Sequence, residues 1–316
     1  MKKKLYLIVM AFVMSMMCLS GCAKKEESSK LVIAYQYGLA FAPMEIMKAN
    51  ELIEKHYDGN VEIEWRVMNS GSAITEGITA GSIDVAAMGT GPFITGVSKG
   101  VPMKMYSPVA NMPYGLMTND NSIRSLQDIT SEDKIAIVNV GSVQHVVLAM
   151  ACEQILGDAH ALDENLVAMS HPDGMASLIS GSVKLHLTNP PYLFQEQASG
   201  DFSEVPVFEG IWDSDNTFEI GVVSNKLAEK KPELVKAIQE ATKEAMGFLT
   251  NNKEESAKIL SQSQDVAEED MLTWLSNESL SYSAEAKGVM DMAEFMQKAG
   301  FIETMPESIE SISVGE

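Results

Sequence analysis

The feature that most constrains the fold is an order of strands and helices that occurs twice along the chain. Short apolar runs and amphipathic segments predict strands at 31–35, 61–67 and 83–88, with helices at 44–53 and 73–79. The same order returns as strands at 134–139, 165–169 and 183–188, with helices at 143–156 and 174–180. Strands that alternate with helices form parallel sheets with right-handed crossovers. The doubled order therefore predicts two similar α/β lobes.

Turn sequences support the match between the two halves. Residues 81–83 (GSI) correspond to residues 181–183 (GSV), and Gly38 takes the place of Gly141. The alternative is that any two strand-helix-strand units look alike in such a comparison. The matched order of three strands and three loops favours a true repeat.

The segments between and after the two units predict how the lobes are joined. A strand at 104–110 leaves the first lobe and one at 218–224 returns to it, which predicts a two-strand hinge beside a cleft. Apolar residues at helical spacing predict helices against the first lobe at 234–250, 253–261, 268–275 and 284–299. Lobe 1 is expected at 31–110 plus 216–316, and lobe 2 at 111–215.

The N-terminal segment has the composition of a secretory signal. Three lysines at 2–4 precede an apolar stretch at 5–19, which ends in Leu19-Ser20-Gly21-Cys22 and resembles a bacterial lipobox. This resemblance implies that a signal peptide, residues 1–21, is removed, that Cys22 is lipidated, and that the protein is anchored outside the cytoplasm. The alternative is a short membrane anchor with an incidental cysteine. Polar residues 22–30 predict a flexible tether.

The balance of charge argues against several partners. With 44 acidic against 23 basic residues, the chain has a formal net charge of −21, so nucleic acid is not an expected partner. Arg66 and Arg124 are the only arginines, so a clamp of guanidinium groups on a carboxylate or phosphate is not expected either. Cys152 lies in an apolar helical segment, which predicts a buried structural thiol.

No motif for catalysis or for a cofactor is convincing. The five histidines show no paired metal-ligand spacing. Gly89-Thr90-Gly91 lacks both the third glycine of a dinucleotide loop and the ending of a P-loop. Ser131 and Lys134 have Ser-x-x-Lys spacing, but they lie in a charged turn without a Lys-Thr-Gly box. We therefore expect no metal, no cofactor and no enzyme activity, and binding without chemistry is the simpler interpretation.

The candidate site lies in the loops that follow the strands. In open α/β sheets, ligands bind beyond the carboxyl ends of the strands, where loops lead into helix N-termini. The first lobe supplies Gln36, Tyr37, Gly38, Phe41, Ser70, Gly71, Ser72, Gly89, Thr90 and Gly91. The second lobe supplies Gly141, Ser142, Val143, Gln144, His145, His171, Asn189 and Tyr192. Each residue also has a structural alternative, because serines cap helices, glycines permit turns and tyrosines pack in cores.

Short motifs occur along the chain in a characteristic order. They are VIAYQ at 32–36, AGSIDVAAMG at 80–89, SLQD at 125–128, GS at 141–142, PDGM at 172–175, PY at 191–192 and KPELV at 231–235. This order resembles the solute-binding proteins of ABC importers for nitrate, sulfonates and taurine, a family that includes binders of thiamine-pyrimidine precursors. The resemblance implies an α/β periplasmic binding protein fold of the second type, whose two lobes close on one small solute. It also implies a monomer that serves an ABC permease and its ATPase and meets the membrane only through its N-terminal lipid.

Two positions depart from the family pattern. Where many relatives have Gly-x-Val-Asp-Ala and Glu-Pro-Tyr, this chain has Lys184 and Pro190 in place of the acids. A buried ammonium group needs a countercharge, so the missing acid at 190 argues against an amine-bearing solute such as taurine. A sulfonate-like anion held by helix starts and hydroxyl groups is favoured. The alternative solute is a neutral heteroaromatic stacked on tyrosine or phenylalanine, such as a thiamine pyrimidine precursor. The alternative functions are an enzyme of that pathway and a sensory or structural lipoprotein.

Overall fold

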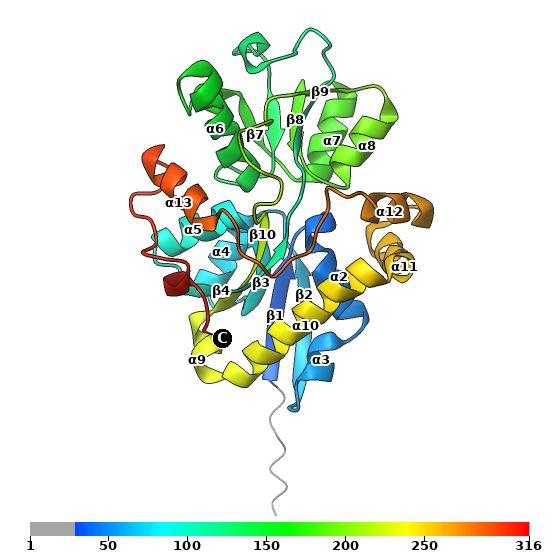
Figure 1. The fold of residues 1–316 in the computed structure, drawn as a ribbon, viewed down its shortest axis with the longest axis vertical. Helices are drawn as coiled ribbons and strands as arrows, with labels where there is room; N and C mark the ends of the chain where they lie inside the picture. The colour runs from blue at the N-terminus through cyan, green and yellow to red at the C-terminus, as the bar shows by residue number, and fades with distance from the viewer. Residues whose placement is uncertain (1–28, 316) are drawn as a thin grey trace, which may run out of the picture.

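The computed structural model describes residues 29–315, which form two lobes, one above the other in Figure 1. The expected signal peptide, Cys22 and most of the expected tether lie outside the described residues. Each lobe is built on a five-stranded sheet. The sheet of lobe 1 contains β1 (Ser29–Tyr35), β2 (Val61–Val67), β3 (Val85–Gly89), β4 (Met103–Ala110) and β10 (Glu219–Ser224). The sheet of lobe 2 contains β5 (Gly115–Thr118), β6 (Ile135–Ile137), β7 (Leu166–Ala168), β8 (Leu185–Thr188) and β9 (Ser203–Val205).

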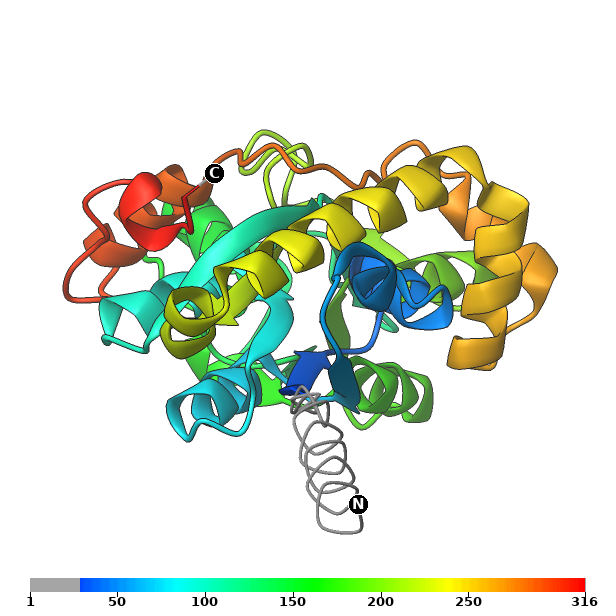
Figure 2. The ribbon, with the colours of Figure 1, turned by 90° about the horizontal axis from the view of Figure 1, so that it is seen from below.

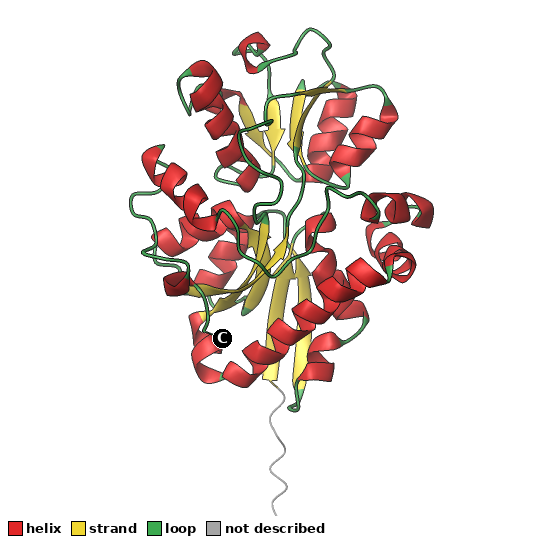
Figure 3. Cartoon of the chain, in the orientation of Figure 1, coloured by secondary structure: helices red, strands yellow, loops and turns green. Residues whose placement is uncertain are grey.

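Both sheets combine a parallel unit with antiparallel strands. The strand orders are β2-β1-β3-β10-β4 and β7-β6-β8-β5-β9, and each begins with three parallel strands, as the doubled sequence order predicts. In lobe 1, β10 arrives from the other lobe and pairs antiparallel with both β3 and β4. In lobe 2, β5 likewise arrives from the other lobe and pairs antiparallel with β8 and β9. In both lobes, the carboxyl ends of the parallel strands face the space between the lobes (Figure 3).

Helices cover both sheets. Lobe 1 carries α2 (Ala42–Ala49), α3 (Leu52–His56), α4 (Gly71–Thr79), α5 (Thr90–Ser98), α9 (Asn225–Lys230), α10 (Pro232–Asn251), α11 (Lys253–Gln264), α12 (Glu268–Leu275) and α13 (Val289–Lys298). Lobe 2 carries α6 (Val143–Leu156), α7 (His171–Ser180) and α8 (Tyr192–Ser199). Single turns of 3₁₀ helix lie at η2 (Leu39–Phe41), η3 (Leu126–Asp128), η4 (Asp163–Asn165) and η5 (Glu310–Ile312).

The C-terminal helices pack on lobe 1, as the sequence predicts. Pro232 opens α10, where its missing N–H costs no hydrogen bond, and the helix buries one apolar face. In Figure 2, α10 runs across the lobe, and it contacts α2, α3 and β4. Apolar residues of α11, α12 and α13 join the same core as β1 and β3. No helix among residues 29–315 combines the length and the apolar composition that a membrane crossing requires.

Several expected elements differ from those observed. The helix expected at 44–53 is two helices, because Glu51 has a positive φ of 49° and separates α2 from α3. The helix expected at 284–299 begins only at Val289, after Gly288 with φ 69°. Thr90 and Gly91 are expected in a loop, but they form the first turn of α5, whose apolar Phe93 and Ile94 are fully buried. The sequence also missed β5, β9, α8 and α9, which are short.

The chain crosses between the sheets after β4 and before β10. Tyr114, in the first crossing, packs edge-on against Phe208 of the second crossing at 5.1 Å between ring centroids. Its hydroxyl donates to the carbonyl oxygen of Trp212, at 3.0 Å. The segment between α12 and α13 runs along the same region and forms a bridge from Ser281 to Asn111. These contacts hold the two connecting segments side by side, as a hinge requires.

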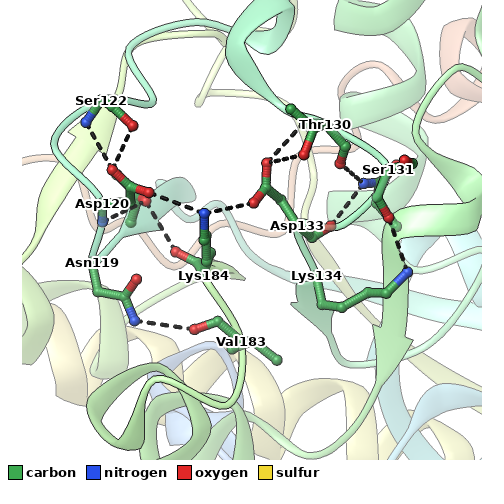
Figure 4. A network of polar contacts seen from close by, with 11 residues as sticks. Asn119, Asp120, Ser122, Thr130, Ser131, Asp133, Lys134, Val183 and Lys184 are labelled. Atoms are coloured by element: carbon green, nitrogen blue, oxygen red, sulfur yellow. Dashed lines mark hydrogen bonds and ion pairs between the residues drawn. The ribbon is translucent and has the colours of Figure 1, made fainter.

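Lys184 has a structural role that explains its departure from the family pattern. Its ammonium group pairs with Asp133 at 2.9 Å and with Asp120 at 3.1 Å, in a polar network at the start of β8 (Figure 4). The corresponding position of lobe 1 holds Asp84, which accepts a hydrogen bond from the backbone N–H of Val32 at 3.0 Å. At this position lobe 2 therefore has a lysine that forms ion pairs with two carboxylates, whereas lobe 1 has a carboxylate that accepts a backbone hydrogen bond.

Candidate functional site

A cavity lies between the lobes at the carboxyl ends of the parallel strands. Its lining residues come from the loops and helix starts that follow β1, β2, β3, β6, β7 and β8, together with the start of β10. They are Gln36, Tyr37, Phe41, Asn69, Gly71, Gly89, Pro92, Val138, Asn139, Ser142, Val143, Gln144, His171, Asn189, Phe218 and Glu219. The volume is about 30 Å³, room for roughly two water molecules. The lobes are therefore nearly closed on each other.

The structure brings most of the sequence-predicted residues to this place. Ten of them line the cavity: Gln36, Tyr37, Phe41, Gly71, Gly89, Ser142, Val143, Gln144, His171 and Asn189. Gly38 and Tyr192 line a larger neighbouring cavity of about 420 Å³, which shares Gln36, Tyr37 and Phe41 with the first. Tyr37, 44% exposed, stands where the two cavities meet. We call these the inner and the outer cavity.

Six predicted residues do not line either cavity, and their contacts give them structural roles. The residues are Ser70, Ser72, Thr90, Gly91, Gly141 and His145. Ser70 caps α4 by accepting from the N–H of Ala73 at 3.3 Å. Thr90 donates its hydroxyl proton to the carbonyl oxygen of Thr217 at 2.8 Å. His145 accepts from the N–H of Gly141 at 2.9 Å, so it shapes the loop rather than the cavity.

Four helices of at least nine residues begin beside the inner cavity: α4, α5, α6 and α7. Ser142 caps α6, because its hydroxyl oxygen accepts from the N–H of His145 at 3.2 Å. The unpaired N–H groups and the dipole of a helix start favour a negatively charged oxygen. The lining of this cavity contains no lysine and no arginine, so an anionic oxygen would meet backbone N–H groups and neutral side chains.

Glu219 is the main residue that sequence analysis missed. Its side chain lines the inner cavity and is 4% exposed, and its Oε2 atom has no hydrogen-bond partner among the described residues. Burial raises the pKa of this carboxyl group well above its ordinary value. The available signal was an acidic residue at the start of the apolar strand 218–224. Only the missing acid at position 190 argues against an amine-bearing solute, whereas Glu219 places a carboxyl group in the cavity from a different element.

Asn139 adds a second unpaired acceptor to the cavity. Its Nδ2 group donates to the carbonyl oxygen of Val140 at 2.8 Å, while its buried Oδ1 atom has no partner among the described residues. Buried acceptors without a partner are uncommon and costly, since desolvation is not compensated. The carboxyl group of Glu219, which keeps an accepting oxygen even when it is protonated, is the other acceptor in this small cavity. The cavity thus presents acceptors to a solute that can donate.

A second set of contacts joins the lobes outside the cavity. The N–H of Leu39 donates to the carbonyl oxygen of Pro190 at 3.1 Å, next to Gly38. On the opposite flank, Lys298 pairs with Glu153 at 3.0 Å. His160 of lobe 2 lies 2.6 Å from the carbonyl oxygen of Ala299, which follows α13. These contacts form only when the lobes are together.

We expect the His160 contact to make closure depend on pH. Its Nε2 meets the Ala299 carbonyl oxygen and its Nδ1 meets Asp163 at 2.7 Å, so both bonds require the doubly protonated ring. The carbonyl oxygen and then the carboxylate raise the pKa of His160 in this closed form. The contact therefore favours closure below the ordinary value of about 6.5 and is lost as the pH rises through the raised value.

Solute dissociation rates measured across this pH range check the expectation. In the wild type, release should become faster as the pH rises, and His160→Gln should remove that part of the dependence. His56→Gln is the matched control, because His56 contacts Glu244 within lobe 1. A pH dependence that is the same in His160→Gln as in the wild type would contradict this role.

Comparisons with known proteins find the same two-lobed fold. The model of the NMT1-like family matches residues 24–262. The taurine-binding periplasmic protein of Escherichia coli K12 is 20% identical over 228 residues, 72% of this chain and 68% of that protein. The periplasmic aliphatic sulphonate binding protein SsuA of E. coli superposes with a TM-score of 0.69 at 19% identity, covering 92% of this chain and 93% of that one.

Two further solved structures extend the comparison. The alkanesulfonate-binding protein SsuA from Xanthomonas axonopodis pv. citri, bound to MOPS, has a TM-score of 0.72 at 18% identity, covering 91% of this chain and 97% of that one. The periplasmic nitrate-binding protein NrtA from Synechocystis PCC 6803 has a TM-score of 0.61 at 18% identity, covering 79% and 70%. These similarities confirm the expected α/β fold, a periplasmic binding protein of the second type.

Proposed function

This chain belongs to the NMT1-like family, and from that premise we propose that it is the solute-binding component of an ABC importer. The relatives with assigned roles are binding proteins of transport systems rather than enzymes. The single observation that carries the proposal is the cavity between two hinged lobes, lined from both sides by loops and helix starts. A site of this kind takes up a small solute when the lobes part and buries it when they close.

The finer part of the proposal concerns the solute. The four helix starts favour an anionic oxygen, which agrees with a sulfonate-like group. The unpaired carboxyl group of Glu219 and the unpaired Oδ1 of Asn139 favour a hydrogen-bond donor in the same cavity. A solute that carries both an acidic group and an N–H group satisfies the two sets together. We therefore propose an amine-bearing sulfonate-like solute in place of the simple anion.

A neutral heteroaromatic solute with an amino group is the second candidate. It is favoured by Tyr37 and Tyr192 in the outer cavity, where aromatic faces are available for stacking. His171 already stacks on Tyr192, at 5.8 Å between ring centroids and 26° between planes. An amino group of such a solute would reach the same acceptors in the inner cavity. The two candidates differ in whether an anionic group is needed.

Isothermal titration with matched solutes tests the proposal. We expect taurine to bind more tightly than ethanesulfonate, which lacks the amine, because the taurine ammonium group can donate to Glu219 and favours the ionised carboxylate there. Glu219→Gln should weaken the taurine complex by about 2 kcal/mol, the value of a hydrogen bond to a charged group, or roughly thirtyfold in Kd. Glu229→Gln is the matched control, since Glu229 is exposed on α9, away from the cavity.

Other members of the panel separate the candidates. A 4-aminopyrimidine that binds more tightly than taurine would favour the heteroaromatic solute, and nitrate or ethanesulfonate binding unaffected by Glu219→Gln would favour the simple anion. No binding by any sulfonate, nitrate or aminopyrimidine would count against the importer role itself.

The proposed location follows from the N-terminal motif. Lipidation at Cys22 would hold the two lobes outside the cytoplasm, near an ABC permease and its ATPase. A tethered receptor has a raised effective concentration at its permease, because the second encounter becomes local. The tether would thereby increase delivery without any contact to the solute.

A further inference from the structure

A chain of four buried polar side chains runs from the wall of the inner cavity into the core of lobe 2. Gln144 Nε2 lies 3.2 Å from Nε2 of His171, and His171 Nδ1 lies 3.3 Å from Nε2 of His186. Nδ1 of His186 lies 2.6 Å from Oε1 of Glu196, on α8. All four side chains are at most 6% exposed. The chain thus joins a group at the solute site to a carboxyl group outside that site.

Each link of such a chain needs one proton, so the links are not independent. When Glu196 is ionised it only accepts, and the proton of His186 must lie on Nδ1. Nε2 of His186 then accepts from Nδ1–H of His171, and Nε2 of His171 accepts from the amide of Gln144. The Nε2 group of Gln144 also lies 3.5 Å from Oδ1 of Asn189. Its carbonyl oxygen is left as an acceptor for the solute.

Protonation of Glu196 reverses every link. The carboxyl proton is then donated to Nδ1 of His186, Nε2–H of His186 donates to Nδ1 of His171, and Nε2–H of His171 points at Gln144. Both rings stay neutral, and the chain holds one proton more, taken from solvent onto the carboxyl group. Two donors cannot face each other, so the amide of Gln144 must turn and accept with its oxygen. Its NH₂ group then becomes a donor for the solute.

We propose that Glu196 is a positioning residue which sets, through His186 and His171, whether Gln144 offers the solute an acceptor or a donor. The proposal rests on the proposed function of the cavity and extends it, because Glu196 itself does not line the cavity. The second carboxyl oxygen, Oε2, is buried without a partner among the described residues, so the chain ends at this group. In a buried chain of this kind, the direction of one hydrogen bond fixes the direction of the next. A single link reversed by itself would place two donors or two acceptors face to face, and that hydrogen bond would be lost.

The protonation states of the members are consistent with this chain. Burial raises the pKa of Glu196 to about 8 and lowers the pKa of His171 and His186 to about 3. The rings therefore remain neutral while the carboxyl group exchanges its proton. The other titratable groups of α8 and of the elements near it are Tyr192, whose pKa burial raises to about 12, Asp173 on α7, exposed and bonded to Ser170, and Glu204 on β9, exposed and bonded to Gln197.

Nuclear magnetic resonance of the solute-free protein tests the proposal. In protein labelled with ¹⁵N-histidine, long-range proton–nitrogen correlations show which ring nitrogen carries the proton. We expect His171 and His186 to carry it on Nε2 at pH 6 and on Nδ1 at pH 10, with one shared midpoint. Glu196→Gln should abolish this exchange. Glu204→Gln, a matched loss of a carboxylate beside α8, should leave it unchanged.

Several results would overturn the proposal. They are rings that keep one tautomer across the range, rings that change at different midpoints, and an exchange that persists in Glu196→Gln. Affinity gives a second measure: for the panel member that binds best, about tenfold of the change in Kd over the same pH range should be lost in Glu196→Gln, leaving only the part that His160 contributes. A constant wild-type Kd despite ring exchange would overturn the link to the solute. Absence of all binding would contradict the importer role alone, because the tautomers are observed without solute.

Discussion

Replacing Gly91 with alanine should weaken solute binding roughly fivefold to more than a hundredfold while leaving the lobes folded. A Cβ atom at Gly91 would lie 2.7 Å from the carbonyl oxygen of Gly141, and these residues belong to opposite lobes. Backbone atoms cannot move aside as a flexible side chain can, so the lobes must stay further apart. Overpacking of this kind costs about 1–3 kcal/mol, which sets the expected change in Kd.

Titration of the tightest-binding solute measures this effect, and urea unfolding shows that the lobes remain stable. Gly247→Ala is the matched control, because Gly247 lies in α10 and its added Cβ would have nothing within 4 Å beyond its chain neighbours and the backbone of its own helix. Alanine there should preserve affinity and slightly raise stability, since it reduces the freedom of the unfolded chain. An affinity in Gly91→Ala equal to that of the wild type would show that closure does not bring Gly91 against Gly141.

Replacing His186 with alanine should lower the free energy of unfolding by about 3 kcal/mol. The side chain is 1% exposed, and its removal leaves Oε1 of Glu196 without its partner at 2.6 Å. An unpaired buried acceptor costs about 1–3 kcal/mol, and the cavity left by the ring adds to this. A Cβ at Gly174 would lie 2.5 Å from His186 Nε2, so the glycine leaves space for the imidazole.

Urea unfolding followed by circular dichroism measures this loss. His56→Ala is the control, because His56 is on the surface of lobe 1 and its contact with Glu244 is exposed. It should change stability by less than about 0.5 kcal/mol. A loss in His186→Ala no larger than in His56→Ala would mean that the buried pair contributes nothing to lobe 2.

The parallel units were predictable because their patterns are local. In β2, Val61 to Val67, apolar and polar residues alternate, and the strand has the predicted bounds. Helix α6 likewise begins and ends where Ser142 caps it and Gly157 stops it with φ 82°. Short strands such as β5 and β9 were missed, since three or four residues hold too little pattern. Helix α5 was missed because Gly91 and Pro92 are typical of a turn.

The candidate site was predictable only where it follows a parallel strand. Gln36, Ser142, His171 and Asn189 all come from such loops and line the cavity. Glu219 does not, because it begins an antiparallel strand that returns from the other lobe. Glu196 was missed for a related reason: it lies on α8 and reaches the site only through two histidines.

The two α/β lobes, their doubled order and the loops that would face a solute follow from local patterns, since hydrophobic period and turn residues act over a few neighbours. Which polar groups have partners follows from the packing of the folded chain. Lys184 is paired with Asp133 and Asp120, whereas Glu219 and Asn139 are left with unpaired acceptors in the cavity. That distinction depends on contacts between residues far apart in the chain, and it is what changes the proposed solute from a simple anion to one that also donates hydrogen bonds.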